Sequence, residues 1–282
     1  MCIYGTINKG MSGFTNIMLS TGGASAPVGV DIDLFATTFL PADDTGIISS
    51  VARGLFVNQA QTKIYTADDT GDLIRAGDIT TDLSTYVENS VSPDVGRPFA
   101  CAASETGDSI YYDGNTVVAQ RDLAVTNDLS SAGGSVATFN AGTGSPNLNQ
   151  IRGLHIDVTG TNFYVGSGNG EVVWLVLSTP WDLSTAIREA YYLSPVVGVG
   201  GWGISFDASG TKMYMAVFNT HEIYQHELST PWDISTASHS GKILTMTGAA
   251  ANSPVDIHMG YTGDVIYVHL FDTDNVIALR AS

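Results

Sequence analysis

Two histidines occupy matching places in a repeated pattern, where they could act together on a metal ion or an anion. His155 and His258 each lie nine residues before a tyrosine. If the strands that carry them line a central channel, their imidazoles would approach each other. Zinc sites usually need three or four protein ligands, and the matching positions Phe56, Ala102 and Ser205 supply none. We therefore predict histidines that pack between sheets or line a wet channel, and no metal site.

Two tryptophans, Trp181 and Trp232, also hold matching places, within LSTPWDLSTA (177–186) and LSTPWDISTA (228–237). One reading is an aromatic platform on which a sugar stacks. The other is a Pro-Trp pair that packs its loop against the neighbouring unit and fixes the register. Because the tryptophan belongs to the repeat itself, we favour the packing role.

Acidic clusters recur in turns and could bind calcium through their oxygens. The clusters are Asp68-Asp69-Thr70-Gly71-Asp72, Asp113-Gly114-Asn115 and Asp272-Thr273-Asp274-Asn275. None has the D-x-D-x-D-G spacing, and Asp, Asn and Gly are ordinary hairpin residues. We predict structural turns.

Motifs of known enzymes are missing from the sequence. It holds no G-x-S-x-G, H-E-x-x-H or P-loop pattern. GSGNGE (166–171) is expected between two strands rather than at the start of a helix, which disfavours dinucleotide binding. We predict no catalytic residue and no cofactor, although a carboxylate pair assembled from distant units stays open as an alternative.

The elements that would position these residues follow from an internal repeat. The two ten-residue segments begin 51 residues apart, and weaker copies stand at Asp82-Leu83-Ser84-Thr85 and Asp128-Leu129-Ser130-Ser131. A second motif is an apolar residue followed by tyrosine, four places after a turn residue that is usually glycine. The five tyrosines, spaced by 46, 53, 50 and 53 residues, are Tyr65, Tyr111, Tyr164, Tyr214 and Tyr267.

Four short strands fit into each repeat, as in the segment GWGISF, TKMYMAVF, HEIYQHEL and GKILTMT. Repetition of such a unit about every 50 residues is typical of a β-propeller. We predict an all-β chain with five four-stranded blades over residues 31–282, and six blades as the alternative. The last unit ends after its third strand, so residues 33–40 are expected to supply the missing strand and close the ring. Residues 1–30 are expected to form an N-terminal arm.

The composition restricts the partners. The net charge is −17 at pH 7, which argues against nucleic acid and anionic membranes because both attract cationic surfaces. Neither a secretory signal nor an apolar run of bilayer length is recognisable. Cys2 and Cys101 are too few for a disulfide framework, and we expect free, partly buried thiols.

The LSTPWDLSTA element, followed by a GISFDASGTKMYM-type segment, resembles a repeat of tail and other virion proteins of marine bacteriophages. The resemblance covers residues 50–282 and is most specific over 153–237. It implies a β-propeller on a virus particle, made in the host cytoplasm, and it implies no catalytic site.

These observations together favour a non-enzymatic virion structural protein of the tail, a fibre or the particle surface. Its expected partners are other virion proteins, reached through the N-terminal arm and present in multiple copies, and a host surface glycan. The alternatives are a carbohydrate- or receptor-binding propeller and a propeller hydrolase such as a lactonase or glycosidase.

Overall fold

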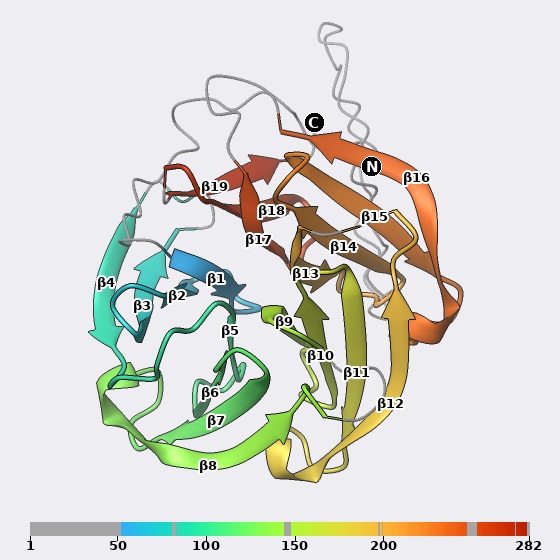
Figure 1. Cartoon of the computed structure of the whole chain (residues 1–282). Coiled ribbons are helices and arrows are strands. Elements are labelled where there is room, and N and C mark those ends of the chain that lie inside the picture. The colour runs from blue at the N-terminus through green and yellow to red at the C-terminus, as the bar shows by residue number, and fades with distance from the viewer. Residues whose placement is uncertain are drawn as a thin grey trace, which may run out of the picture.

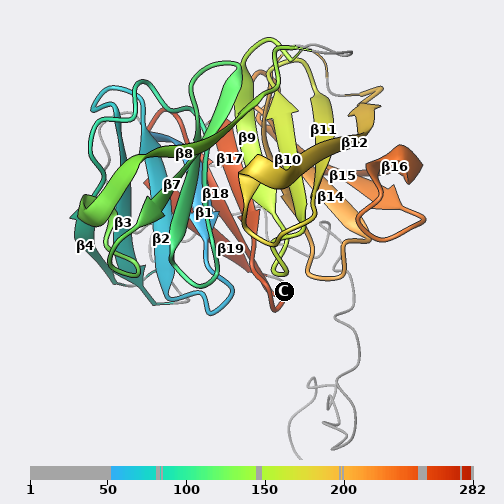
Figure 2. The same cartoon turned by 90° about the horizontal axis from the view of Figure 1, so that it is seen from below.

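The computed structural model describes residues 52–80, 83, 85–143, 148–196, 198, 200–246, 253–273 and 275–280. In this part of the chain five antiparallel sheets stand around a central axis (Figure 1). Seen from the side, they form a flattened ring (Figure 2). No helix among the described residues is long and apolar enough to cross a membrane.

Each sheet is one blade, and its strands follow the chain outward from the axis. Blade 1 is β1 (Ala52–Val57), β2 (Lys63–Asp68), β3 (Leu73–Ile79) and β4 (Tyr86–Val91). Blade 2 is β5 (Cys101–Ala103), β6 (Ser109–Asp113), β7 (Val117–Leu123) and β8 (Ala132–Asn140). Blade 3 is β9 (Ile151–Ile156), β10 (Asn162–Ser167), β11 (Glu171–Leu177) and β12 (Ala186–Leu193). Blade 4 is β13 (Gly201–Phe206), β14 (Lys212–Val217), β15 (Glu222–Leu228) and β16 (Ala237–Thr245). Blade 5 is β17 (Pro254–Met259), β18 (Val265–Leu270) and β19 (Asn275–Arg280).

The innermost strands β1, β5, β9, β13 and β17 contact one another in succession, and β17 contacts β1, so the ring is closed. The predicted five-bladed propeller is therefore confirmed. Blade 5 has three strands in the described residues. The predicted closing strand at 33–40 and the predicted arm at 1–30 lie outside the described residues.

Close approach of the innermost strands requires small residues at one level of the channel. A Cβ added at Gly153 would lie 2.8 Å from the backbone nitrogen of Ile204, and one at Gly54 would lie 2.7 Å from the Cα of Ala100. A side chain at Gly54 or Gly153 would collide with the backbone of the neighbouring blade. These glycines therefore allow the inner strands of neighbouring blades to approach this closely.

The repeated LSTPWDLSTA segment forms the loop between the third and fourth strands of a blade. Short 3₁₀ turns follow its aspartate in blades 2, 3 and 4: η3 (Leu129–Ser131), η4 (Leu183–Thr185) and η5 (Ile234–Thr236). In η4 the Asp182 carboxylate caps the turn by accepting from the Ser184 backbone N–H. Leu183 is buried, and η4 contacts β8 of the preceding blade. The loop therefore joins two blades.

Tyrosines of the second strands fasten blades 1, 2 and 3 each to the following blade. Tyr111 donates its hydroxyl hydrogen bond to the carbonyl of Trp181, and Tyr164 donates to the carbonyl of Trp232 at 2.6 Å. In blade 2 an asparagine replaces the tryptophan, and Tyr65 donates to the side-chain oxygen of Asn127 at 3.0 Å. We call these contacts between Tyr65, Tyr111, Tyr164 or Tyr267 and the next blade the tyrosine latches.

The seam between blades 5 and 1 carries the same kind of latch. Tyr267 donates to the side-chain oxygen of Gln61 at 2.9 Å. Deeper in the ring, the backbone N–H of Leu55 donates to the buried Asp256 carboxyl group at 2.7 Å. Residues more than 200 positions apart therefore complete the circle.

Removal of one latch hydroxyl should weaken the whole ring. In Tyr164→Phe the Trp232 carbonyl loses its donor, and we expect the free energy of unfolding to fall by about 1–2 kcal/mol. Urea titration followed by tryptophan fluorescence measures this. Tyr224→Phe is the control, because the Tyr224 hydroxyl donates to Glu222 within its own strand, and we expect a change within about 0.5 kcal/mol. An equal loss of unfolding free energy in both variants would show that a latch hydrogen bond stabilises the ring no more than a hydrogen bond within one strand does.

Candidate functional site

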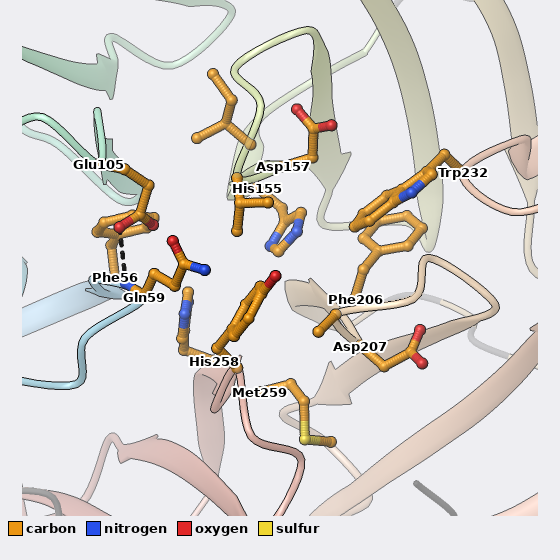
Figure 3. Close-up of a pocket in the computed structure, with 14 residues that line it drawn as sticks. Phe56, Gln59, Glu105, His155, Asp157, Phe206, Asp207, Trp232, His258 and Met259 are labelled. Atoms are coloured by element: carbon orange, nitrogen blue, oxygen red, sulfur yellow. Dashed lines mark hydrogen bonds between the residues drawn. The ribbon is translucent and has the colours of Figure 1, made fainter. Parts of the chain in front are cut away.

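The predicted histidine pair meets at the end of the channel where the innermost strands finish, which we call the exit end (Figure 3). The ring centroids of His155 and His258 lie 6.2 Å apart. His258 meets the Phe56 ring edge-on at 5.1 Å, and His155 packs on Phe206 at 5.1 Å. Trp232 stacks on His155 at 6.4 Å. The two imidazoles thus belong to an aromatic cluster between blades.

Both imidazoles are neutral at physiological pH. Burial lowers the pKa of His155 to about 3, and burial together with the neighbouring His155 lowers the pKa of His258 to about 3. A neutral pair offers no positive charge to an anion. It retains nitrogen donors and acceptors for a neutral polar partner.

The cavity at the exit end is small, about 30 Å³, which suits one or two water molecules. The carboxylates on its rim are engaged by backbone groups. Glu105 accepts from the Gln59 N–H at 2.7 Å, Asp157 accepts from the Thr161 N–H at 2.9 Å, and Asp207 accepts from the Lys212 N–H at 2.8 Å. The site in this form is a plug of the channel rather than a cleft for a substrate.

The carboxylates of two acidic turns accept backbone hydrogen bonds. Asp68 accepts from the backbone of Thr70 and Gly71, and Asp113 accepts from Phe99, Ala100 and Asn115. Over the described ranges, no group of three His, Cys, Asp or Glu side chains could hold a metal ion. Cys101 is a free thiol and is fully buried, more so than expected, and Cys2 lies outside the described residues.

The two repeat tryptophans occupy a rare backbone conformation. Trp181 has φ 66° and Trp232 has φ 68°, in the left-handed region. The indole of Trp181 lies directly over Gly160, where an added Cβ would come within 2.3 Å of it. The glycines four places before Tyr164 and Tyr214 therefore make room for Trp181 and Trp232 as well as forming a turn.

Trp181 also borders an open groove between blades 2 and 3. The groove has a volume of about 470 Å³, and Asp108, Asp122, Asp182 and Ser104 share its walls. Trp181 is half-buried, so part of its ring faces this groove. The arrangement combines an aromatic surface with carboxylates, which are acceptors for sugar hydroxyls.

Sequence reasoning overlooked a set of arginines at the opposite end of the channel, where the innermost strands begin. We call this the entry end. Three residues before the position that holds His155 in blade 3, the first four blades carry Arg53, Phe99, Arg152 and Trp202. Alignment of the repeats at this position would have shown that arginine alternates with aromatic residues in the first four blades.

The buried histidines should make the protein sensitive to acid. In the unfolded chain His155 gains its proton near pH 6.5, and in the folded chain it does so near pH 3. The stability that the neutral His155 contributes to the folded state is therefore complete above pH 6.5, and it is lost as the pH falls from 6.5 toward 3. Relative to His155→Ala, the free energy of unfolding of the wild type should fall by about 1.4 kcal/mol per pH unit between these values.

Denaturant titrations from pH 7 to pH 4 measure that difference. Phe206→Leu is the control, because it disturbs the same cluster without removing a titrating group. Its pH profile should run parallel to that of the wild type. A His155→Ala profile that is also parallel would contradict a neutral, buried His155.

Comparisons with known proteins show structural likeness at low sequence identity. No protein-family model matches it, and no curated protein matches it. Among solved structures it is similar to the β-propeller domain of Cps50 (Swd1) from Myceliophteria thermophila, with 11% identity, a TM-score of 0.49 and coverage of 82% of this chain and 83% of that chain. It is also similar to hydrazine synthase of Kuenenia stuttgartiensis, with 12% identity, a TM-score of 0.47 and coverage of 82% and 84%. Likeness of this degree carries no argument about activity or partners, so the five-bladed assignment depends on the strand pairing itself.

Proposed function

We propose that this protein is a non-enzymatic structural protein of a bacteriophage particle, a component of the tail, a fibre or the particle surface. In this role the propeller presents a rigid rim for assembly or host attachment, and residues 1–30 dock to other virion proteins. The observation that carries the proposal is the exposed apolar surface of the outermost strands.

The outermost strand of each of blades 1 to 4 exposes a large apolar side chain. Val87 on β4 is 63% exposed, Val136 on β8 is 56% exposed, Ile187 on β12 is 64% exposed and Ile243 on β16 is 41% exposed. An outermost strand that carries apolar residues is a ready surface for another protein chain. Repetition around the rim fits a subunit that packs sideways against neighbours.

The residues that the blades share also support a structural role. Four of the five repeat tyrosines and both repeat tryptophans take part in the latches, and the central histidines are neutral. The repeat therefore preserves mechanical contacts between blades. The resemblance of LSTPWDLSTA to repeats of phage virion proteins is the reason for proposing a phage particle.

Particle composition tests this proposal. Phage particles purified by density gradient from the material that carries the gene should contain the chain at many copies per particle, measured by quantitative mass spectrometry. Detection in host extract and never in purified particles would overturn the assignment.

The rim itself is tested by Ile187→Lys, which places a charge on β12. We expect incorporation into particles to fall at least tenfold while the circular dichroism spectrum stays unchanged. Glu189→Gln, on the same exposed face of β12, should be incorporated normally. Normal incorporation of the lysine variant would contradict the role of this rim.

The groove beside Trp181 favours a second candidate function, the binding of a host surface glycan. Its volume of about 470 Å³ suits a small ligand, and its walls pair an indole with carboxylates. Asn127 occupies the equivalent place in blade 2 and has a similar positive φ, 61°, so Trp181→Asn should preserve the backbone of the loop.

Glycan arrays and adsorption to host cells test this candidate. We expect Trp181→Asn to lose glycan binding and the matched variant Trp232→Asn to keep it. Wild-type protein that binds no host surface sugar, or that loses binding equally in both variants, would remove the groove as a glycan site.

A further inference from the structure

Positive charge gathers at the entry end of the channel, in a protein with net charge −17 and only 11 Lys and Arg residues. Three of those residues, Arg53, Arg97 and Arg152, lie close enough for Arg53 and Arg97 to influence the ionisation of Arg152. Such clustering is costly without a compensating anion, because like charges repel most strongly where water is displaced.

Aromatic rings hold two of these guanidinium groups in fixed planes. Arg152 lies over the Phe99 ring at 3.9 Å and over the Trp202 ring at 4.6 Å. Arg53 lies over the Phe271 ring at 4.1 Å. Stacking on aromatic faces fixes each guanidinium without using its N–H groups. The donors are therefore positioned in advance.

The carboxylates near the cluster leave Arg152 without an ion pair in the described structure. Asp69 accepts from both Arg53, at 3.3 Å, and Arg97, at 3.5 Å. Asp113 is committed to the backbone N–H groups of its own blade, and burial raises its pKa to about 6. The cluster thus keeps an excess of positive charge.

Two buried donors have no acceptor. Nη1 of Arg53 and Nη1 of Arg152 are both shielded from solvent and have no hydrogen-bond partner among the described residues. Arg152 uses Nη2 for the side-chain oxygen of Gln150 at 3.1 Å. A buried cationic donor without an acceptor costs more than a neutral one, and an oxyanion would satisfy it.

A cavity of about 440 Å³ lies beside this cluster, and Arg97, Phe99 and Arg152 are among the residues that line it. Two further lining residues have positive φ, Asn115 at 75° and Gln150 at 89°. Backbone strain of this kind gathers at binding sites, where the surrounding structure maintains it. The volume falls in the range of small-molecule sites.

We propose that the entry end of the channel is a binding site for a small oxyanion, a sulfate, phosphate or carboxylate group carried by a ligand, held by Arg97 and Arg152 with Arg53 behind them. The site is independent of the particle assignment and of the glycan groove beside Trp181, which opens next to the turn at the other ends of the strands. A ligand places its anionic group against the stacked arginines and its remainder in the cavity.

Isothermal titration of the full chain in Tris-chloride at constant ionic strength tests the site, with sodium sulfate, sodium phosphate and sodium glucuronate as separate probes. We expect saturable binding of at least one probe at one equivalent. Tighter binding of sulfate or phosphate identifies a tetrahedral anion as the natural group, and tighter binding of glucuronate identifies a carboxylate.

Arg97→Gln and Arg152→Gln should each raise the Kd at least tenfold. Arg188→Gln is the matched control, since that arginine lies over the Phe139 ring at 5.7 Å on another part of the molecule, and it should bind as the wild type does. The Arg97 side chain is 69% exposed, so its variant reports on the site even if Arg152→Gln fails to fold. No saturable binding of any probe, or an unchanged Kd in Arg97→Gln, would overturn the proposal.

Discussion

The tyrosine latch is the interaction on which the ring depends. A propeller blade buries its faces only against other blades, so the five sheets are stable as a circle and not as separate units. Each latch places a phenolic donor from one blade on an acceptor of the next, inside an apolar seam. Burial strongly raises the pKa of Tyr111 and Tyr164, so these hydroxyls remain donors across the physiological range.

The latch also explains why the repeat is unevenly preserved along the chain. Backbone N–H groups of Asn127, Trp181 and Trp232 all donate to the carbonyl of the turn glycine in their own blade, at 2.8–2.9 Å. All three residues make this hydrogen bond with a left-handed backbone conformation. Asparagine adopts that conformation more easily than tryptophan does. Blade 2 therefore keeps the contact while losing the Pro-Trp pair.

Much of the architecture could be predicted from the sequence, because the tyrosine spacing, the turn glycines and the alternating apolar residues are local signals. The meeting of His155 and His258 followed from their shared place in the repeat. The pKa values and the size of the cavity between them could not be predicted, since both depend on how Phe206 and Trp232 fill the exit end. The arginines were missed for a different reason. Arg53 and Arg152 look like isolated surface charges until the first strands are aligned, and Phe271, on which Arg53 stacks, comes from a distant part of the chain.

The two ends of the channel have opposite character as a result. Aromatic and neutral imidazole rings close the exit end, and guanidinium groups between aromatic rings surround the entry end.

The replacement of tryptophan by asparagine in blade 2 has a mechanical consequence. The joints between blades are not all alike. Between blades 1 and 2 the acceptor is the amide of Asn127, on a side chain with its own rotational freedom, and the facing inner strand carries only Cys101, Ala102 and Ala103. Short side chains such as these bury less apolar area than a phenylalanine or methionine would. The joint between blades 1 and 2 therefore holds a side-chain acceptor where the next two joints hold a backbone carbonyl, so its latch can adjust by a side-chain rotation alone.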